Sequence, residues 1–319
     1  MKRLLLLIAI CAAMCVGATV LSGCKRTTQN GSGKPRIALV MKSLANEFFK
    51  TMENGAREHQ KAHSDEYTLI CNGIKNETDV TRQIEIVEQM IAQRVDALVL
   101  APADSKSLVP VCKKAQEAGI VVVNIDNKLD DETLESKGTE IPFVGPDNRK
   151  GARMAAEYLA ENKLQAGDQV AIVEGVPNAF NSVQRVKGFR DAMKAADVEI
   201  VSSQSGSWMQ DEAEQVVAGM ISQHPNLDAI LCANDSMVLG AISALKSAGK
   251  LNQVELIGYD NIGAIQDLIK EGTVLCTIDQ HADKIAAYGI EYALEMLNKN
   301  TRPEDRETPV DLITAEDLK

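Results

Sequence analysis

The stretch that decides the fold is residues 36–71, RIALVMKSLANEFFKTMENGAREHQKAHSDEYTLIC. It opens with a short apolar run at 36–41, continues with helical spacing of apolar residues over 47–63, and returns to a second apolar run at 67–71. A strand, a helix and another strand in this order predict two parallel strands joined by a crossover helix.

The same alternation of strand and helix continues along the chain. Up to residue 146 it predicts further elements at 79–93, 97–100, 108–118, 120–124 and 141–145. After Gly145-Pro146 it restarts, with helices expected at 148–162, 183–195, 211–224, 237–248, 262–270 and 282–297. Strands are expected at 170–174, 200–205, 229–232, 254–259 and 273–278. So many parallel strands exceed what one doubly wound sheet holds comfortably. The sequence therefore predicts an α/β fold of two similar doubly wound parallel-sheet lobes with a ligand cleft between them.

Composition narrows the class of protein. The 319 residues suggest about two domains at roughly 150 residues each. Apolar residues make up 45% and charged residues 25%, an ordinary globular balance that excludes disorder and a multi-span membrane protein. The net charge of -11, without a run of Lys or Arg, makes nucleic acid an unexpected partner.

The N-terminus has the pattern of an export segment. Lys2 and Arg3 precede an apolar stretch at 4–21, and Leu21-Ser22-Gly23-Cys24 resembles the lipobox of bacterial lipoproteins. We expect a signal peptide at 1–23, a lipidated Cys24 and a flexible tether over 24–34. The mature protein is then a periplasmic or cell-surface lipoprotein that contacts the membrane only through its lipid. A plain signal anchor is the alternative.

Four cysteines remain in the mature chain: Cys71, Cys112, Cys232 and Cys276. An even number in an exported protein leaves disulfides open. Three of them lie inside apolar strand-like runs, so free buried thiols are the favoured interpretation. The four histidines are scattered, and no metal site is expected.

Polar and aromatic residues recur where the predicted strands end. Open α/β sheets bind ligands at the carboxyl ends of their strands, so these residues are the candidate site. Carboxylates and amides under flat rings are the chemistry of sugar and polyol capture, because they accept hydrogen bonds from hydroxyls while the rings cover C–H faces. For any one of them, a helix cap or a turn is the alternative. The strand-end candidates are Lys42, Asn46, Phe48, Phe49, Asp126, Asn127, Trp208, Asn234, Tyr259, Asp260 and Gln280.

Motifs for catalysis are weak. The sequence contains no G-x-G-x-x-G opening a helix after a strand, no phosphate-binding G-x-x-x-x-G-K-[ST], and no G-x-S-x-G elbow with a plausible histidine partner. We therefore expect no enzyme activity and no cofactor. A lipid-anchored glycosidase using Asp126 and Asp260 as its carboxylate pair is the enzymatic alternative.

Four motifs in order resemble one known family. They are Ile37-Ala38-Leu39-Val40 followed by Asn46-Glu47-Phe48-Phe49, Asn234-Asp235-Ser236-Met237-Val238-Leu239-Gly240-Ala241, Gly258-Tyr259-Asp260, and Thr277-Ile278-Asp279-Gln280. Together they resemble the ribose-binding-protein branch of the periplasmic sugar-binding proteins of ABC importers, over nearly the whole mature chain.

The resemblance implies a fold with three crossovers that form a hinge, near 146–147, 280 and 310–311. The N-terminal lobe would comprise 35–146 plus 281–310, and the C-terminal lobe 147–280 plus 311–319. It also implies a monomeric solute-binding lipoprotein that captures a monosaccharide or polyol by lobe closure and delivers it to the permease of an ABC importer. A sugar receptor for a membrane chemosensor or sensor kinase remains the alternative.

Matching positions imply roles for the first lobe. Asn46, Phe48 and Phe49 would contact the ligand, and Asp126 would hold two hydroxyls with Asn127 beside it. Lys42 stands where the family has a small hydroxyl residue. It could recognise an acidic sugar, although pairing with a carboxylate such as Asp126 is the favoured interpretation.

In the second lobe the resemblance makes Trp208 a stacking ring, Asn234 and Asp260 polar ligands, Tyr259 an aromatic wall and Gln280 a hinge amide. The run Arg185-Val186-Lys187-Gly188-Phe189 resembles a family signature. Val183 occupies the place of a ligand arginine, so Asn181 or Gln184 is expected to substitute. These departures put ribose itself in doubt, and another pentose, a hexose or a polyol fits equally well.

Overall fold

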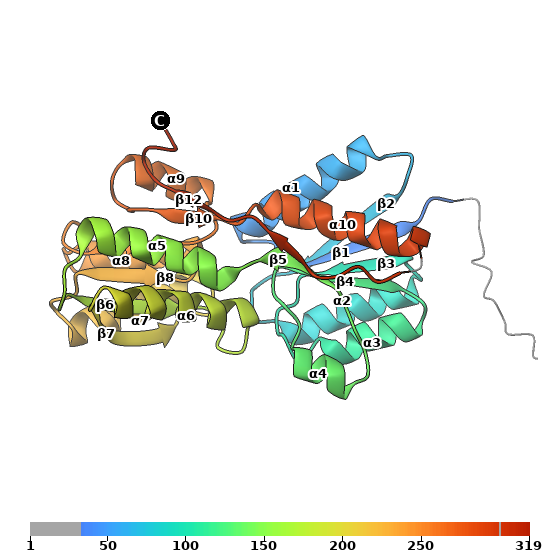
Figure 1. The fold of residues 1–319 in the computed structure, drawn as a ribbon, viewed down its shortest axis with the longest axis horizontal. Helices are drawn as coiled ribbons and strands as arrows, with labels where there is room; N and C mark the ends of the chain where they lie inside the picture. Colours follow the sequence, from blue (N-terminus) through green and yellow to red (C-terminus); the bar gives the residue numbers. More distant parts are fainter. Residues whose placement is uncertain (1–32, 300) are drawn as a thin grey trace, which may run out of the picture. The chain divides into compact units, whose positions relative to one another are not determined.

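The computed structural model of the protein describes residues 33–299 and 301–319. The expected signal peptide, the expected lipidation at Cys24 and the tether up to residue 32 lie outside the described residues. The chain forms two α/β lobes, which confirms the predicted fold class (Figure 1).

Lobe 1 is built on a six-stranded sheet in the order β11-β5-β4-β3-β1-β2. Its strands are β1 (Arg36–Ser43), β2 (Thr68–Ile74), β3 (Ala97–Leu100), β4 (Val121–Ile125), β5 (Phe143–Pro146) and β11 (Arg306–Thr308). All its pairings are parallel, including β1 with β2, so the strand–helix–strand unit read from residues 36–71 is confirmed.

Helices cover both faces of the lobe 1 sheet. On one face α1 (Glu47–Ala62) packs beside α10 (Ala282–Lys299), and on the other α2 (Val80–Ala92) packs beside α3 (Val109–Glu117). Alternate residues of β1 point to opposite faces. Leu39 therefore joins the apolar cluster that contains Met52 of α1, whereas Val40 joins the cluster that contains Val87 of α2.

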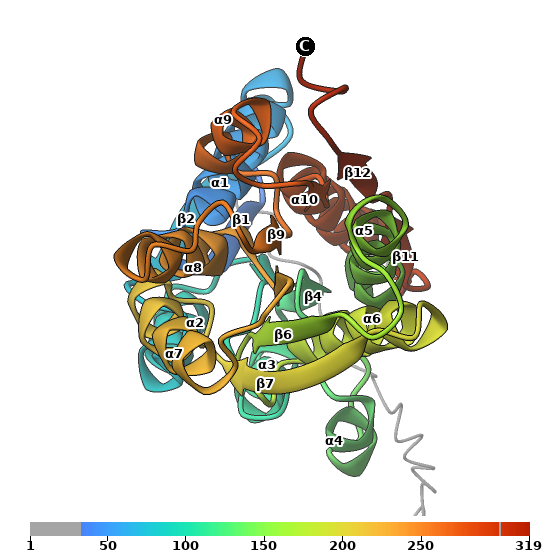
Figure 2. The same cartoon turned by 90° about the vertical axis from the view of Figure 1, so that its left-hand side faces the viewer.

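Lobe 2 repeats this plan on a four-stranded parallel sheet in the order β7-β6-β8-β9. Its strands are β6 (Gln169–Glu174), β7 (Glu199–Ser205), β8 (Ala229–Cys232) and β9 (Glu255–Ile257). Figure 2 shows α5 and α6 on one side of this sheet and α7 and α8 on the other. The helices of lobe 2 are α5 (Asn148–Lys163), α6 (Phe180–Ala195), α7 (Gln210–Gln223), α8 (Asp235–Ser247) and α9 (Gly263–Lys270).

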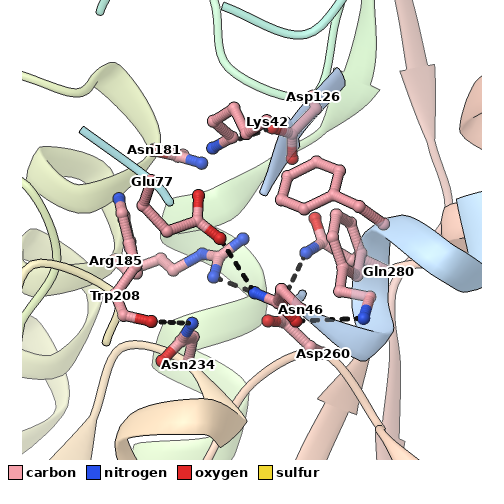
Figure 3. Close-up of a pocket in the computed structure, with 12 residues that line it drawn as sticks. Lys42, Asn46, Glu77, Asp126, Asn181, Arg185, Trp208, Asn234, Asp260 and Gln280 are labelled. Carbon is pink, nitrogen blue, oxygen red and sulfur yellow. Dashed lines mark hydrogen bonds and ion pairs between the residues drawn. The ribbon is translucent and has the colours of Figure 1, made fainter. Parts of the chain in front are cut away.

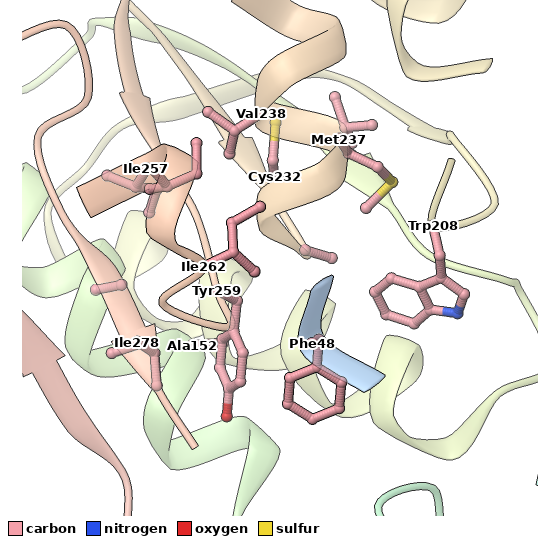
Figure 4. Packing of buried hydrophobic residues seen from close by; sticks show 14 of the residues in the cluster. Phe48, Ala152, Trp208, Cys232, Met237, Val238, Ile257, Tyr259, Ile262 and Ile278 are labelled. Atoms are coloured by element: carbon pink, nitrogen blue, oxygen red, sulfur yellow. The ribbon is translucent and has the colours of Figure 1, made fainter. Parts of the chain in front are cut away.

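The two lobes are connected by more than one chain segment. The chain leaves β5 of lobe 1 for α5 of lobe 2, and it returns from β10 (Thr277–Asp279) into α10. It then runs from β11, which pairs with β5, into β12 (Asp311–Ile313), which pairs antiparallel with β10. One apolar cluster contains residues of both lobes, among them Phe48, Tyr259 and Ile262 (Figure 4).

Three short elements were not predicted: α4 (Asp131–Ser136), β11 and β12. Strands β9 and β10 are also shorter than the expected runs at 254–259 and 273–278. The four cysteines in the described part of the chain are free, as favoured from the sequence. Among the residues that the structure describes, no helix has both the length and the apolar character needed to cross a bilayer.

Candidate ligand-binding site

Residues from both lobes line one small polar pocket (Figure 3). The lining residues are Lys42, Asn46, Phe48, Phe49, Glu77, Asp126, Asn181, Arg185, Trp208, Asn234, Asp260 and Gln280. The pocket therefore lies where strands of the two sheets end, as the strand-end argument predicts.

The start of α1 shapes the lobe 1 wall. Asn46 is the N-cap of this helix, and its Oδ1 accepts a hydrogen bond from Phe48 N at 3.0 Å. Its Nδ2 donates to Glu77 Oε1 at 3.1 Å. The next two side chains, Phe48 and Phe49, are both buried and meet edge to face with ring centroids 5.0 Å apart. The amide of Asn46 is thus a helix cap and a pocket residue at once.

Lys42 and Asp126 form a buried ion pair. Lys42 Nζ lies 3.1 Å from Asp126 Oδ2, and the two side chains are 4% and 2% exposed. The sequence left two interpretations of Lys42, recognition of an acidic sugar or pairing with a carboxylate such as Asp126, and this ion pair is the favoured one. The ammonium also lies 5.3 Å from the centroid of the Phe49 ring and 5.9 Å from that of Trp208, which belongs to lobe 2. The charge on Lys42 is therefore already partnered before any ligand enters.

Glu77 was missed from the sequence. It follows β2 and is buried, and burial raises its pKa to about 7, against the opposing influence of the Lys42 charge and the Asn46 hydrogen bond. The other site residues were predicted because they are polar residues just beyond the end of a strand. The same criterion applied to the end of β2 would have identified Glu77.

Arg185 is the second residue missed. It is buried, its guanidinium lies 3.4 Å from Asp260 Oδ1, and it stacks 3.6 Å from the centroid of the Tyr259 ring. It also donates to Asn148 Oδ1 and to the Ala233 carbonyl, both at 2.8 Å. Arg185 stands one helical turn after Asn181 on α6, so the two share a face, which could have indicated it. Of the two substitutes expected for Val183, Asn181 lines the pocket and Gln184 does not.

Asp260 is held from two sides. Arg185 pairs with Oδ1, and Gln280 Nε2 donates to the same oxygen at 2.7 Å. Burial raises the pKa of Asp260 well above its usual range, while the charge on Arg185 and the Gln280 hydrogen bond act in the opposite direction. Gln280 Oε1 is buried without a hydrogen-bond partner among the described residues, so it is free to accept a hydrogen bond from a ligand.

Asp235 supports the segment that carries Asp260. Its Oδ2 accepts from Ile262 N at 3.0 Å, and its Oδ1 accepts from Thr277 Oγ1 at 2.8 Å. These bonds fix a backbone that turns through positive φ at Asp260 (123°) and Asn261 (57°). The turn directs Asp260 into the pocket.

Asn234 and Trp208 complete the lobe 2 wall. Asn234 caps α8, since its Oδ1 accepts from Met237 N at 2.9 Å, and its Nδ2 donates to the Trp208 carbonyl at 3.4 Å. Trp208 is 5% exposed and has a positive φ of 66°, like Asp126 at 63°. Left-handed backbone at non-glycine residues is uncommon and collects at functional sites.

Two expected site residues, Asn127 and Tyr259, do not line the pocket. The Tyr259 ring is fully buried beneath the Arg185 guanidinium, so it supports the pocket floor instead of facing the ligand. The Asn127 amide is occupied elsewhere: Nδ2 donates to the Pro102 carbonyl at 3.0 Å, and Oδ1 accepts from Asn181 N at 3.2 Å. The other ten expected residues are brought together, and Glu77 and Arg185 join them.

The arrangement can bind a small molecule rich in hydroxyl groups. Carboxylate and amide oxygens lie on both lobes as acceptors, while Phe48, Phe49 and Trp208 provide apolar walls. Within the described residues, no group of three or more His, Cys, Asp or Glu is placed to hold a metal ion.

Two α/β lobes that enclose one polar pocket at their strand ends define a bilobal solute-binding protein. Residues 37–301 match the family model described as a periplasmic binding protein domain, and the chain belongs to this family. As the motifs indicated, its relatives place it in the ribose-binding-like branch.

The comparisons with individual proteins agree. The D-ribose/D-allose-binding protein of Pseudomonas aeruginosa is 57% identical over 88% of this chain and 89% of that protein. An ABC transporter solute-binding protein from Burkholderia multivorans, with an unknown ligand built as α-D-erythrofuranose, is 58% identical, with a TM-score of 0.86 over 88% of this chain and 100% of that one. One from Actinobacillus succinogenes with bound D-allose is 36% identical, with a TM-score of 0.84 over 89% and 99%.

Proposed function

We propose that this protein is a monomeric extracytoplasmic solute-binding lipoprotein that captures a monosaccharide by lobe closure and delivers it to an ABC importer. The observation that carries the proposal is the pocket itself, to which both lobes contribute carboxylate, amide and aromatic side chains. Because only a closed arrangement brings both sets to one ligand, the ligand favours closure. The segments at 146–147, 280 and 310–311 would act as the hinge.

The charges favour a neutral ligand. Two cations, Lys42 and Arg185, face the three carboxyl groups of Glu77, Asp126 and Asp260. Each cation already has a carboxylate partner, Lys42 in Asp126 and Arg185 in Asp260. An added carboxylate or phosphate would therefore find no unpaired positive charge in the pocket and would meet repulsion. An acidic sugar is the less favoured ligand, and a neutral aldose is the proposed one.

The proposed sugar class is that of D-ribose and D-allose. A relative with more than half of its residues identical is named for these two sugars, and a solved relative is described with bound D-allose. Both are neutral and offer several vicinal hydroxyls, which suits paired carboxylate acceptors on opposite walls.

Calorimetric titration of the purified soluble part of the chain tests the proposal. D-Ribose, D-allose and myo-inositol would be titrated beside D-ribonate and D-glucuronate as acidic controls. We expect saturable binding of at least one neutral sugar, and no binding of the acids. Tight binding of an acid would overturn the argument from charge, and failure of all the neutral compounds would overturn the function.

The lipid anchor is tested separately in cells. The Cys24→Ser variant should lose incorporation of labelled palmitate and leave the membrane fraction. If Cys24→Ser remains in the membrane as the wild type does, the plain signal anchor is the correct alternative.

A further inference from the structure

Hydrogen bonds cross from lobe 1 to lobe 2 outside the pocket, and they end on the first N–H groups of two helices. The first N–H groups of any helix have no partner inside it and are normally satisfied by a side-chain cap from the residue just before the helix. In lobe 2 the residue before α6 is Ala179 and the residue before α9 is Ile262. Neither side chain provides a capping hydrogen bond.

The N-terminus of α6 takes its acceptors from lobe 1. Phe180 N donates to Ser105 Oγ at 3.1 Å, and Asn181 N donates to Asn127 Oδ1 at 3.2 Å. Both acceptor residues are buried: Ser105 is 3% exposed and Asn127 is 0% exposed. A buried N–H without an acceptor is unfavourable, so these donors need lobe 1, or water, to be satisfied.

The lobe 1 acceptors are already oriented. Asn127 Nδ2 is fixed on the Pro102 carbonyl at 3.0 Å, and Ser105 Oγ donates to Asn127 Oδ1 at 3.4 Å. The two oxygens therefore form a small preformed receptor for the end of α6, and little side-chain freedom is lost when the lobes meet.

The N-terminus of α9 is capped from the same direction. Gly263 N donates to Glu47 Oε1 at 2.8 Å, and Glu47 is the first residue of α1 in lobe 1. A carboxylate at a helix N-terminus is also favoured by the helix dipole. This contact is exposed, so we expect it to contribute less than the buried pair at α6.

The neighbouring helices show the contrast. In lobe 2, α5 is capped by its own Asp147, which accepts from Lys150 N at 3.0 Å, and α8 by its own Asn234. These caps are present whether the lobes are open or closed. The caps of α6 and α9 exist only when lobe 1 lies against lobe 2.

We propose that Ser105, Asn127 and Glu47 set the sugar affinity by capping α6 and α9 across the cleft, although none of the three lines the pocket. The inference rests on the proposed function, because it assumes that sugar binds the closed form. The apparent affinity of such a ligand scales with the fraction of protein that is competent to bind. Removing a cap that only the closed form makes therefore weakens binding without altering a ligand contact.

The experiment compares matched variants by titration with D-ribose and D-allose. Ser105→Ala removes the acceptor of Phe180 N, and Ser107→Ala, in the same loop but exposed, is its control. We expect Ser105→Ala to weaken binding about threefold to tenfold, the usual effect of losing one cap, and Ser107→Ala to bind as the wild type does.

The α9 cap is tested by a double-mutant cycle. Glu47→Ala removes the acceptor and Gly263→Pro removes the donor. Proline is tolerated at the first helical position, and Ile262 before it has φ -70° and ψ 150°, which suits a residue preceding proline. Each variant should weaken binding about twofold to fivefold, and the double variant no more than either alone. If Glu47 acted only within α1, the losses of sugar affinity in the two single variants would instead add in the double variant.

Two controls keep the outcomes distinct. Thermal unfolding without sugar should match the wild type, which excludes misfolding as the cause of weaker binding. One outcome would overturn the inference and leave the proposed function intact: the wild type binds sugar, and Ser105→Ala binds it with the same affinity as Ser107→Ala. If neither sugar binds the wild type, the proposed function fails. The inference then fails with it, because it requires a sugar that binds the closed form.

Discussion

Lys42 and Asp126 remove two full charges from water at the base of the pocket. A buried ion pair is weak evidence for stability, because the loss of hydration offsets most of the attraction between the charges. Its placement beside Phe49 and Trp208 indicates a different role. The ammonium orients the carboxylate as a hydrogen-bond acceptor for ligand hydroxyls.

This role predicts the behaviour of Asp126→Asn. An amide of the same size cannot pair with Lys42 and is a weaker acceptor, so sugar affinity should fall by about tenfold to a hundredfold. The free energy of unfolding should fall by about 3 kcal/mol, because Lys42 is left buried and unpaired. Calorimetric titration and urea unfolding measure the two effects. Asp131→Asn, which breaks an exposed pair with Lys128, is the control and should change neither appreciably.

Glu77 predicts a pH dependence of stability. In the unfolded chain it ionises near its ordinary pKa of 4.5, whereas burial in the folded protein raises the pKa to about 7. Between these values only the unfolded chain releases the proton, so the free energy of unfolding falls as the pH rises from 4.5 to 7, by about 3 kcal/mol in total.

Urea unfolding at pH 5 and at pH 7.5 tests this dependence with Glu77→Gln, which cannot ionise but can still accept from Asn46. The wild type should lose roughly 2–3 kcal/mol more than Glu77→Gln between the two pH values. Glu85→Gln, on the exposed face of α2, should behave as the wild type does. An equal loss in the wild type and Glu77→Gln would show that Glu77 does not keep its proton in the folded protein.

The limits of sequence interpretation at this scale are physical. Strand-end chemistry identified Lys42, Asp126 and Asp260 because strand ends are local features. The amide of Asn127 was misplaced because its partners are distant in sequence: Pro102 meets it when lobe 1 folds, and Asn181 meets it when the two lobes pack. Arg185 shares a helix face with Asn181, but its partners Asn148 and Asp260 are distant in sequence and meet it only when α6 docks.

At the scale of elements, the loops after the strands position the pocket rings. Trp208, in the loop between β7 and α7, takes a left-handed backbone, and its indole packs over Gly175 at the end of β6. A Cβ at position 175 would overlap the indole ring. Glycine is therefore required there by close approach.

Gly175→Ala is expected to displace Trp208 and weaken sugar binding by about tenfold, since the ring leaves its place in the wall. Because Trp208 is the single tryptophan in the sequence, its emission reports the change directly and should shift to longer wavelength. Gly219→Ala in α7 is the control. Apart from its chain neighbours and the backbone of its own helix, nothing lies within 4 Å of its Cβ position, so affinity should be unchanged and stability should rise by up to about 1 kcal/mol. Unchanged emission and affinity in Gly175→Ala would contradict the prediction.

Elements with strong apolar periodicity were predicted to within a few residues, as for β3 at 97–100 and β8 at 229–232. Strand β11 has the sequence RET and joins the sheet through backbone pairing with β5, so its side chains carry no strand pattern. The antiparallel pairing of β12 with β10 likewise depends on the chain returning to lobe 2, which is a property of the whole fold.

At the scale of the whole molecule, the lobes are joined by packing as well as by chain crossings. The apolar cluster that contains Met52 and Phe48 of lobe 1 also contains Tyr259 and Ile262 of lobe 2 (Figure 4). The second cluster, around Val87, belongs to lobe 1. A core shared in this way couples the unfolding of one lobe to that of the other, although proteins of two lobes often depart from two-state behaviour.

We therefore expect one cooperative unfolding transition for the sugar-free protein in scanning calorimetry, with van't Hoff and calorimetric enthalpies in agreement. A sugar held by both lobes should raise the whole transition. At a free sugar concentration one hundred times the Kd, the free energy of unfolding should increase by about 2.7 kcal/mol. Two resolved transitions, or a sugar that moves only part of a single one, would show that the lobes unfold separately. The shared cluster would then bring the lobes into contact without coupling their stability, and sugar binding could not stabilise both lobes together.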